Sequence, residues 1–369
     1  MNILIATEPD DHHAILVKLA LEKTGHLVDL LFTADHPTKQ RNTIFIDNKN
    51  YQWISTDGRS PISNDKHEVV WWRRARKPYI PKNLLHPDDY PIVTRENASF
   101  HESLSKTIAT NAWWVNSREA AYKARSKLLQ LKIAADCGLN IPTTLCTNDP
   151  QNIREFLCKM ENVIYKPLTL NLWPEKEHIK IAYTSKLNSS DLSDDTLLQL
   201  VPGIYQKEIK KNYELRITCF GDYIVSAKLN SQSHLLGKTD WRRIPDEELS
   251  IEPYQLPNPI KEKIQKFMHK MGLVFGALDF IVTPEEEYFF LEVNEQGQFL
   301  WIEDSNPDFN MLDIFVNFLT NKSTNFQWEP QKTQHHIIQY ADEVEDITAW
   351  QMEQHVHLNQ AMFIHSEGL

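Results

Sequence analysis

The chain has 369 residues, enough for about two or three domains with sizeable hydrophobic cores. Its 39 Lys and Arg residues stand against 50 Asp and Glu residues, and the net charge of −11 argues against a protein that coats DNA or RNA, because such a surface repels phosphate. The chain has only 10 glycines and neither a GxGxxG nor a GxxxxGK[ST] motif, which disfavours a glycine-cradled dinucleotide site. The 4 cysteines are too few and too widely spaced for a disulfide framework or a CxxC metal site, which favours a reducing compartment.

The N-terminus gives no sign of secretion. It turns acidic at Glu8, whereas a secretory signal needs a basic start and a longer apolar run. No stretch reaches the roughly 18 apolar residues of a membrane span. We therefore expect a cytoplasmic protein that has neither nucleic acid nor a membrane as a partner.

The first part of the chain has the pattern of an α/β domain. Short apolar runs predict strands at 2–7, 27–33 and 68–72. An amphipathic helix is expected between Asp11, an N-cap candidate, and Gly25, a residue typical of a helix C-terminus.

A second unit begins at Ser117, which we expect to cap one Ala-rich helix running to Cys137. A short helix after Pro150 and strands at 163–166 and near 179–184 follow. Two hairpins come next. The first pairs strands 213–220 and 223–230 around a Gly221-Asp222 turn, and the second pairs strands 278–283 and 288–293. A helix is expected before the second hairpin, at 257–271, and another after it, at 309–319. The last 45 or so residues are polar, bear several histidines and have no clear period.

The second hairpin carries paired carboxylates. If residues 284–287 form a four-residue loop, Thr283 faces Tyr288, and the same register places Asp279 opposite Glu292 with Cβ atoms about 4.5–5.5 Å apart. Asn294 shares their face. The other face is expected to be core: Phe280, Val282, Phe289, Leu291 and Val293. Two carboxylates so close repel each other unless one is protonated or a cation lies between them, and with an amide oxygen they suit Mg²⁺. The plainer alternative is a solvated acidic face.

Several basic residues are candidates for holding phosphates near this hairpin. Lys127 lies in the Ala-rich helix, and Lys166 ends an apolar strand, where its charge needs a partner. Arg216 and Lys228 lie on the two strands of the first hairpin. They point to opposite faces if the loop has two residues and to one face if it has three, and the sequence leaves both open.

The order of these residues resembles the ATP-grasp ligases and, more narrowly, the graspetide (microviridin-type) peptide macrocyclases. The resemblance covers about residues 1–320. It rests on Lys127, Lys166, Gln206-Lys-Glu208-Ile209, Glu214-Leu-Arg216, Asp279 and Leu-Glu292-Val-Asn294. Further matching stretches are Val-Val-Trp-Trp-Arg73-Arg74, Ile-Val-Ser-Ala-Lys228, Gly-Gln-Phe-Leu-Trp-Ile-Glu303, and Asp240-Trp-Arg242, which is similar to the DxR motif of these enzymes.

The resemblance implies an α/β (α+β) ATP-grasp fold. A pre-ATP-grasp domain would occupy residues 1–116 and the ATP-grasp domain residues 117–323. The latter would comprise a central lobe, about 117–205, and a C-terminal lobe, about 206–323. Residues 324–369 would form an extension of unknown role.

The resemblance also implies roles for individual residues. Lys127 and Lys166 would bind the ATP phosphates. The other ATP-binding positions would be Gln206, Lys207, Glu208 and Ile209, whose backbone would meet adenine, and Glu214. Mg²⁺ would be held by Asp279, Glu292 and Asn294. Arg216 and Lys228 would be catalytic, near the γ-phosphate and the incoming carboxylate. Substrate would be bound by Arg242, held by Asp240, and by Arg73 and Arg74.

The implied activity is a ligase reaction that uses ATP and Mg²⁺. Asp or Glu side chains of a ribosomal precursor peptide, with a leader and an acidic core, would be phosphorylated and then joined to Thr, Ser or Lys side chains. A homodimer is common among such ligases. Two alternatives stay open: a ligase for amino acids or short peptides, of the glutathione-synthetase or glutamate-ligase type, and a catalytically silent scaffold that binds ATP and peptide.

Two stretches depart from the family pattern. Residues 167–176 contain no glycine, although many ATP-grasp proteins cover the phosphates with a Gly-rich lid. The C-terminal extension has five irregularly spaced histidines, which suit a solvated or dimer-contact tail better than a metal site. They are His335, His336, His355, His357 and His365.

Overall fold

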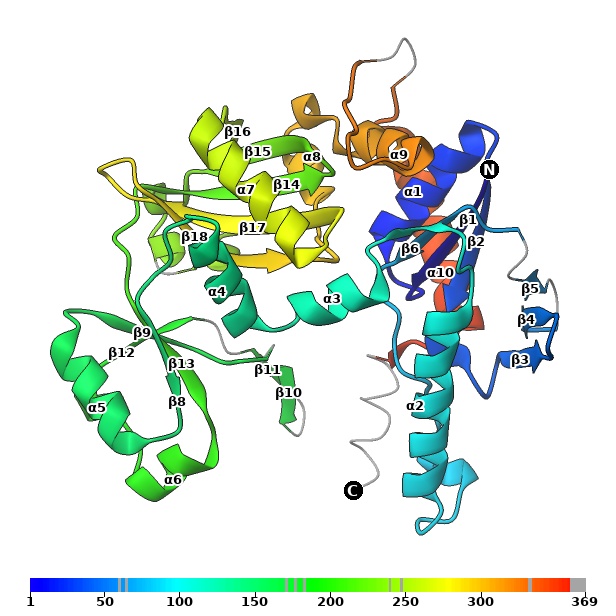
Figure 1. Ribbon diagram of the computed structural model, residues 1–369, viewed down its shortest axis with the longest axis horizontal. Helices are drawn as coiled ribbons and strands as arrows, with labels where there is room; N and C mark the ends of the chain where they lie inside the picture. The colour runs from blue at the N-terminus through cyan, green and yellow to red at the C-terminus, as the bar shows by residue number, and fades with distance from the viewer. Residues whose placement is uncertain are drawn as a thin grey trace.

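The computed structural model describes residues 1–58, 61–63, 66–169, 172–175, 178–181, 184–238, 240–245, 248–330 and 334–358. The chain has the expected α/β architecture, with an N-terminal α/β domain and two further lobes built on antiparallel sheets (Figure 1). In the part of the chain described, no helix is long and apolar enough to cross a membrane.

The N-terminal domain is built on a four-stranded parallel sheet of order β2-β1-β6-β7. Its strands are β1 (Asn2–Thr7), β2 (Leu27–Phe32), β6 (Val69–Trp72) and β7 (Trp113–Val115). β1 and β6 are buried on both faces, as their unbroken apolar sequences predict. One face packs against α1 (His12–Lys23), which ends at Gly25 with a φ of +83° as expected.

The other face of this sheet is covered by elements that the sequence analysis did not assign. They are the strands β3 (Arg41–Ile46), β4 (Tyr51–Thr56) and β5 (Ile62–Ser63) and the helix α2 (Tyr90–Thr107). Trp53 and Leu104 pack there against Leu4 and Trp72 in one buried cluster. α2 carries mostly polar side chains, and in β3 the apolar Phe45 and Ile46 are exposed, so neither element shows a regular apolar face.

The single helix expected over 117–137 is two helices, α3 (Arg118–Ala124) and α4 (Lys127–Asp136). Ser117 caps α3 as predicted, by accepting a hydrogen bond from the Ala120 N–H. Ser126 is a second cap, because its hydroxyl oxygen accepts the Leu129 N–H. The break places Lys127 at the start of α4, where the helix lies against the C-terminal lobe (Figure 1).

The central lobe has a four-stranded antiparallel sheet of order β12-β9-β13-β8. The strands are β8 (Thr144–Thr147), β9 (Val163–Lys166), β12 (Ser185–Leu187) and β13 (Gly203–Lys207), and the helices are α5 (Pro150–Lys159) and α6 (Asp195–Leu200). A hairpin of β10 (Leu172–Glu175) and β11 (His178–Ile181) follows β9. Of the glycine-free stretch after Lys166, residues 172–175 form β10, residues 167–169 lie between β9 and the hairpin, and residues 170, 171 and 176 lie outside the described residues.

The C-terminal lobe has a five-stranded antiparallel sheet of order β16-β15-β14-β17-β18. Its strands are β14 (Tyr213–Phe220), β15 (Tyr223–Leu229), β16 (Ile251–Pro253), β17 (Phe275–Val282) and β18 (Tyr288–Asn294). α4 and α7 (Asn258–Met271) pack on one face of this sheet over Leu215, Leu278 and Phe280. Asp279 and Glu292 therefore lie on the opposite face, between this lobe and the central lobe.

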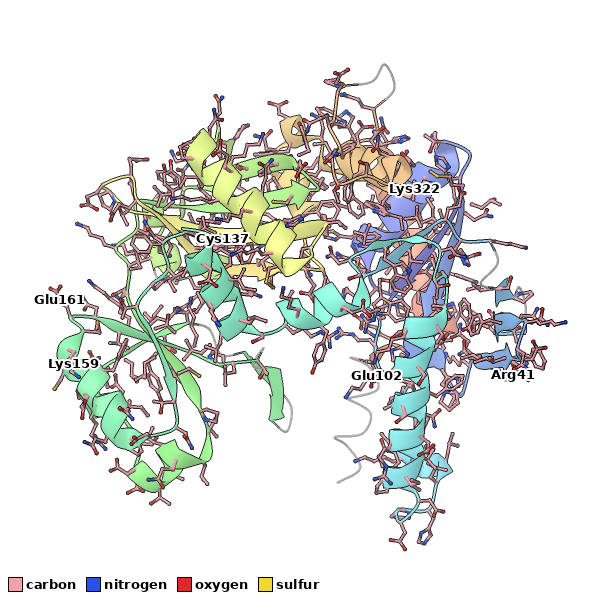
Figure 2. The ribbon with its side chains drawn as sticks, viewed as in Figure 1. Arg41, Glu102, Cys137, Lys159, Glu161 and Lys322 are labelled. Atoms are coloured by element: carbon pink, nitrogen blue, oxygen red, sulfur yellow. The ribbon has the colours of Figure 1, made fainter. Side chains whose placement is uncertain are left out.

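The C-terminal extension packs on the N-terminal domain. Its helix α10 (Ala341–Gln354) contacts α1, and so does α9 (Met311–Asn321), which precedes the extension. Lys322, at the end of α9, lies 3.4 Å from Glu68 (Figure 2). The His355 and His357 rings pair with Asp35 (2.5 Å) and Asp10 (3.1 Å) rather than with each other. Residues 334–358 are thus not a solvated tail, a dimer contact through their exposed side stays a prediction, and His365 lies outside the described residues.

Candidate functional site

Asp279 and Glu292 are directly paired across β17 and β18, as predicted, but by a different route. The Thr283 N–H bonds to the Glu287 carbonyl, so the loop is one residue shorter than assumed. A β-bulge between Asp279 and Phe280 then shifts the register back. This change of register also makes the core prediction wrong in part. Phe289 and Leu291 were expected in the core but are only partly buried, and Phe290 is fully buried instead.

Arg216 makes the strongest contacts of Asp279. Its Nη1 donates to both carboxylate oxygens of Asp279 at 2.8 Å, and its Nη2 donates to the Gln298 carbonyl at 3.1 Å. The Nε of Arg216 is buried and has no hydrogen-bond acceptor among the described residues. Burial raises the pKa of Asp279, and the negative charge of Glu292 raises it further. The Arg216 guanidinium acts in the opposite direction and lowers it. The Asn294 amide nitrogen lies 3.4 Å from Asp279, which completes the predicted trio on one face.

Two lysines from other elements converge on Glu292. The Nζ of Lys127, on α4, lies 3.5 Å from its carboxylate. Lys166, at the end of β9, interacts with the same carboxylate, and burial lowers the pKa of this lysine while Glu292 acts to raise it. Burial alone would raise the pKa of Glu292. The charges of Lys127 and Lys166 hold it below its ordinary value, with smaller contributions from Arg242 and Arg216. Glu292 is therefore ionised within a cationic setting.

The DxR segment supplies the fourth cation. Asp240, whose side chain is 3% exposed, accepts two hydrogen bonds of 2.8 Å from the Nε and Nη2 of Arg242. The pKa of Arg242 is raised, first by this hydrogen-bonded carboxylate and then by the Asp279 and Glu292 charges. The Arg242 side chain is half exposed. The expected hold of Asp240 on Arg242 is therefore present, and the substrate-binding role of Arg242 stays a prediction.

These contacts bring together four cations around two carboxylates. The cations are Lys127, Lys166, Arg216 and Arg242. The cluster has an excess of positive charge, which suits a polyphosphate. Among the described residues no group of three or more His, Cys, Asp or Glu side chains could hold a metal ion. Asp279, Glu292 and Asn294 thus fit Mg²⁺ only if further oxygens come from outside the chain, as nucleotide phosphates would provide.

The predicted adenine segment is placed partly as expected. Lys166 pairs with Ile204 across the sheet, so Gln206 shares its face. The Gln206 side chain is 2% exposed, and its Oε1 has no hydrogen-bond partner in the described chain. The N–H groups of Lys207 and Glu208 are already bonded to the carbonyls of residues 143 and 162, so those two donors are not free for a base.

Lys228 differs from the prediction, whereas the ATP-binding role of Glu214 stays a prediction. Burial raises the pKa of Glu214, which accepts hydrogen bonds from Lys211 (2.7 Å) and Ser231 (2.9 Å) and so lies in a small buried network. The Gly221-Asp222 turn leaves a two-residue loop, so Lys228 pairs with Leu215 and faces away from Arg216. Its Nζ lies over the Tyr213 ring at 4.8 Å. A joint catalytic role for Arg216 and Lys228 is therefore not compatible with this register.

The arginines predicted to bind an acidic substrate are paired within the N-terminal domain. Arg73 is 1% exposed, and its Nε donates to Asp11 at 2.7 Å. Arg74 pairs with Glu8 at 2.7 Å and lies 3.9 Å from Asp10. The strongly basic sequence around residues 73–77 does not create a free positive surface, because the acidic residues after β1 neutralise it. The substrate-binding prediction is thus wrong for Arg73.

Sequence reasoning missed Gln130, which ties α4 to β18. Its side chain donates to the Val293 carbonyl at 3.0 Å and accepts the Val293 N–H at 2.8 Å, and it is 3% exposed. Val293 lies between Glu292 and Asn294, so this contact sets α4 and its Lys127 against the carboxylate strand. The detectable sign was a polar residue on the buried side of an Ala-rich helix.

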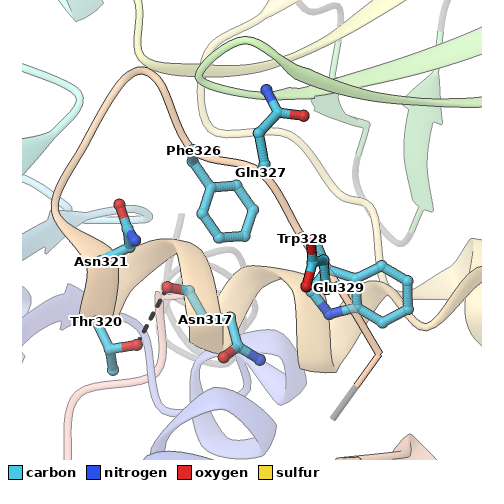
Figure 3. Close-up of a pocket in the computed structure, with 7 residues that line it drawn as sticks. All are labelled: Asn317, Thr320, Asn321, Phe326, Gln327, Trp328 and Glu329. Carbon is cyan, nitrogen blue, oxygen red and sulfur yellow. Dashed lines mark hydrogen bonds between the residues drawn. The ribbon is translucent and has the colours of Figure 1, made fainter.

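A surface pocket lies elsewhere, between α9 and residues 326–329 (Figure 3). It is lined by Asn317, Thr320, Asn321, Phe326, Gln327, Trp328 and Glu329. Its one acidic side chain has no basic partner in the lining. It contains no residue of the cationic cluster, and we assign it no function.

Comparisons with known proteins concern the chain as a whole. No family model and no curated relative matches the chain. Among solved structures, the RiPP-associated ATP-grasp ligase of Chryseobacterium gregarium, in complex with ADP and a leader and core peptide, is 26% identical over 90% of this chain and 99% of that one, with a TM-score of 0.80. Macrocyclase MdnC of Microcystis aeruginosa MRC, bound with precursor peptide MdnA, is 28% identical over 88% of this chain and 100% of that one (TM-score 0.78).

Macrocyclase MdnB of the same organism is 28% identical over 86% of this chain and 98% of its own (TM-score 0.73). These likenesses extend over nearly the full length of each enzyme, in sequence as well as in fold. In fold and in sequence, the chain therefore matches the RiPP-associated and microviridin-type ATP-grasp ligases over nearly their full length.

Proposed function

We propose that this protein is an ATP- and Mg²⁺-dependent ligase that forms side-chain ester or amide bonds within a ribosomal precursor peptide. The observation that carries the proposal is the convergence of four cations on the Asp279–Glu292 pair, with the half-exposed Arg242 among them. A cationic site of this kind suits both a triphosphate and the acidic side chain that it would activate.

A carboxylate is a poor electrophile, and ATP removes this obstacle. An oxygen of the peptide's Asp or Glu side chain would attack the γ-phosphorus, the bond to the β–γ bridging oxygen would break, and ADP would leave. A Thr or Ser hydroxyl, or a Lys amine, would then attack the acyl carbon. Inorganic phosphate would leave with the electron pair of the C–O bond, and the nucleophile's proton would pass to solvent or phosphate. No nucleophile of the protein is required.

The residues of the site have distinct parts in this scheme. Lys127 and Lys166 would hold the phosphates and Arg216 the transferring group, where charge accumulates. Arg242, fixed by Asp240, would seat the acidic side chain of the peptide. Bound through Asp279, Glu292 and Asn294, Mg²⁺ would offset the charge of the phosphate oxygens.

The test is the intact mass of a candidate precursor peptide, one encoded by a neighbouring gene and rich in Asp or Glu with Thr, Ser or Lys, after incubation with the protein, ATP and Mg²⁺. The proposal requires the loss of one water for each bond formed, and alkaline hydrolysis then separates esters from amides. ADP release with an unchanged peptide mass would favour the ligase for amino acids or short peptides. Neither product would favour the silent scaffold. The homodimer stays a prediction, which light scattering can decide.

A further inference from the structure

Residues 295–300, which we call the linking segment, follow Asn294 and lead into α8 (Trp301–Ser305). The middle of this segment holds Arg216, because the Gln298 carbonyl accepts the 3.1 Å hydrogen bond from its Nη2. The same carbonyl accepts the Trp301 Nε1–H at 3.1 Å. The place of the Arg216 guanidinium therefore depends on where the linking segment lies.

Three side chains of the N-terminal domain, which we call the clamp, bind the backbone of this segment. Asn116, just after β7, donates to the Glu295 carbonyl at 2.9 Å. Arg73, just after β6, donates through Nη1 to the carbonyls of residues 296 and 297 at 2.7 and 3.1 Å. His13, on α1, accepts the N–H groups of residues 299 and 300 at 3.1 Å each. The clamp thus binds on both sides of Gln298.

Each clamp residue is itself held firmly. Asn116 is 3% exposed, and its amide also binds the backbone of residues 274 and 275, at the start of β17. Arg73 is fixed by Asp11, which in turn accepts the Thr7 hydroxyl at 2.6 Å. The His13 ring lies edge-on to Phe299, with centroids 5.3 Å apart. Burial and the Arg73 charge keep the pKa of His13 well below its ordinary value, so the ring is neutral and its Nε2 can accept.

We propose that the clamp (His13, Arg73 and Asn116) positions the active site, an inference that rests on the proposed ligase function. By fixing the linking segment, it holds the Gln298 carbonyl that orients Arg216 against Asp279. None of the three touches the cationic cluster in the structure, so they act through other residues and are positioning residues. The N-terminal domain thereby contributes to catalysis indirectly, through the position of Arg216. It also explains why Arg73 is buried although its neighbours are basic and partly exposed.

The decisive experiment compares His13→Leu with His13→Gln, which keeps an acceptor oxygen. The matched control is His67→Leu. His67 is a histidine of the same domain whose side chain is 1% exposed and pairs with Asp29 at 2.8 Å. It lies before β6, whereas Arg73 lies after β6. Assays are run at a temperature where thermal unfolding shows every variant to be folded. Two readouts are measured: kcat for ADP release with Mg²⁺ and the precursor peptide, and hydrogen exchange of the Phe299 and Leu300 amides.

We expect His13→Leu to accelerate exchange at both amides and to lower kcat by about 10- to 100-fold, the usual effect of losing a group that orients an active site. His13→Gln should restore most of kcat, and His67→Leu should leave kcat and the exchange of these amides unchanged. A His13→Leu kcat equal to that of His67→Leu would overturn the proposal, whether or not exchange rises. His13→Gln tests whether an acceptor oxygen at this position rescues kcat. Because every variant is assayed where it is folded, a general loss of stability cannot imitate the expected pattern.

The failure of the proposed function would look different. In that case the wild type releases no ADP with the peptide, and the clamp is then judged by the affinity for AMP-PNP with Mg²⁺. Weaker binding by His13→Leu than by His67→Leu supports the clamp, and equal binding overturns it.

Discussion

Replacing Asp279 by Asn tests the central ion pair of the site. The Arg216 and Asp279 side chains are 7% and 17% exposed, and two hydrogen bonds of 2.8 Å join them. Removing one partner of a buried pair costs about 3–5 kcal/mol, because the other charge is left without compensation. Asn keeps one acceptor oxygen, Gln298 still binds the guanidinium, and the pair is not fully buried. We therefore expect the free energy of unfolding to fall by about 2–3 kcal/mol.

The assay is urea unfolding at neutral pH, followed by circular dichroism, beside a measurement of Mg²⁺-dependent ADP release. Asp279→Asn should remain folded without denaturant and lose ADP release. A matched control is Glu287→Gln in the exposed loop of the same hairpin, which should stay within about 0.5 kcal/mol of the wild type. An unchanged unfolding midpoint would show that Asp279 does not stabilise Arg216. Undiminished ADP release would remove Asp279 from the metal site.

Three further changes test other parts of the structure. Arg242→Ala should raise the KM for the peptide more than the KM for ATP, and a collapse of ATP affinity instead would move Arg242 to the phosphates. Gln130→Leu leaves the N–H and carbonyl of Val293 unpaired and should lower the free energy of unfolding by about 2–4 kcal/mol in urea, whereas a loss below about 1 kcal/mol would contradict that role. Burial, aided by Arg118, lowers the pKa of His101 to about 4 from 6.5. The unfolded chain therefore takes up the proton first, so this contribution to stability is complete above pH 6.5 and is lost as the pH falls towards 4. His101→Gln should flatten the pH dependence of the melting temperature in that window, and an unaltered slope would exclude His101 as its source.

The sequence was sufficient where the chemistry depends on local spacing. The pairing of Asp279 with Glu292 followed from hairpin alternation, although the assumed loop length was wrong and only the bulge kept the conclusion correct. The same alternation placed Phe289 rather than Phe290 in the core, because a bulge leaves no clear pattern in one strand. The two-residue loop before Tyr223 was one of two open readings.

Long-range pairing could not be predicted. The basic run around Arg73 suggests a positive surface until the fold brings Asp11 and the carbonyls of residues 296 and 297 against it. The break between α3 and α4 depends on Ser126, which caps α4. Because Ser is tolerated within helices, the sequence from 117 to 137 also fits one continuous helix, and the break cannot be seen in it. The packing of α10 on α1 depends on an apolar stripe too narrow to show a period.

The packing of α9 and α10 on α1 has a consequence for how the chain folds during synthesis. α1 leaves the ribosome about 300 residues before the helices that cover it are made. Until then, the apolar side chains of α1 that face α9 stay uncovered, since no earlier segment takes that place. Contacts so distant in sequence form slowly, and uncovered apolar surface promotes aggregation. The N-terminal domain is thus translated before the two other lobes and is among the last to complete its core, so a fragment ending before α9 should depend on chaperones that the whole chain needs only briefly.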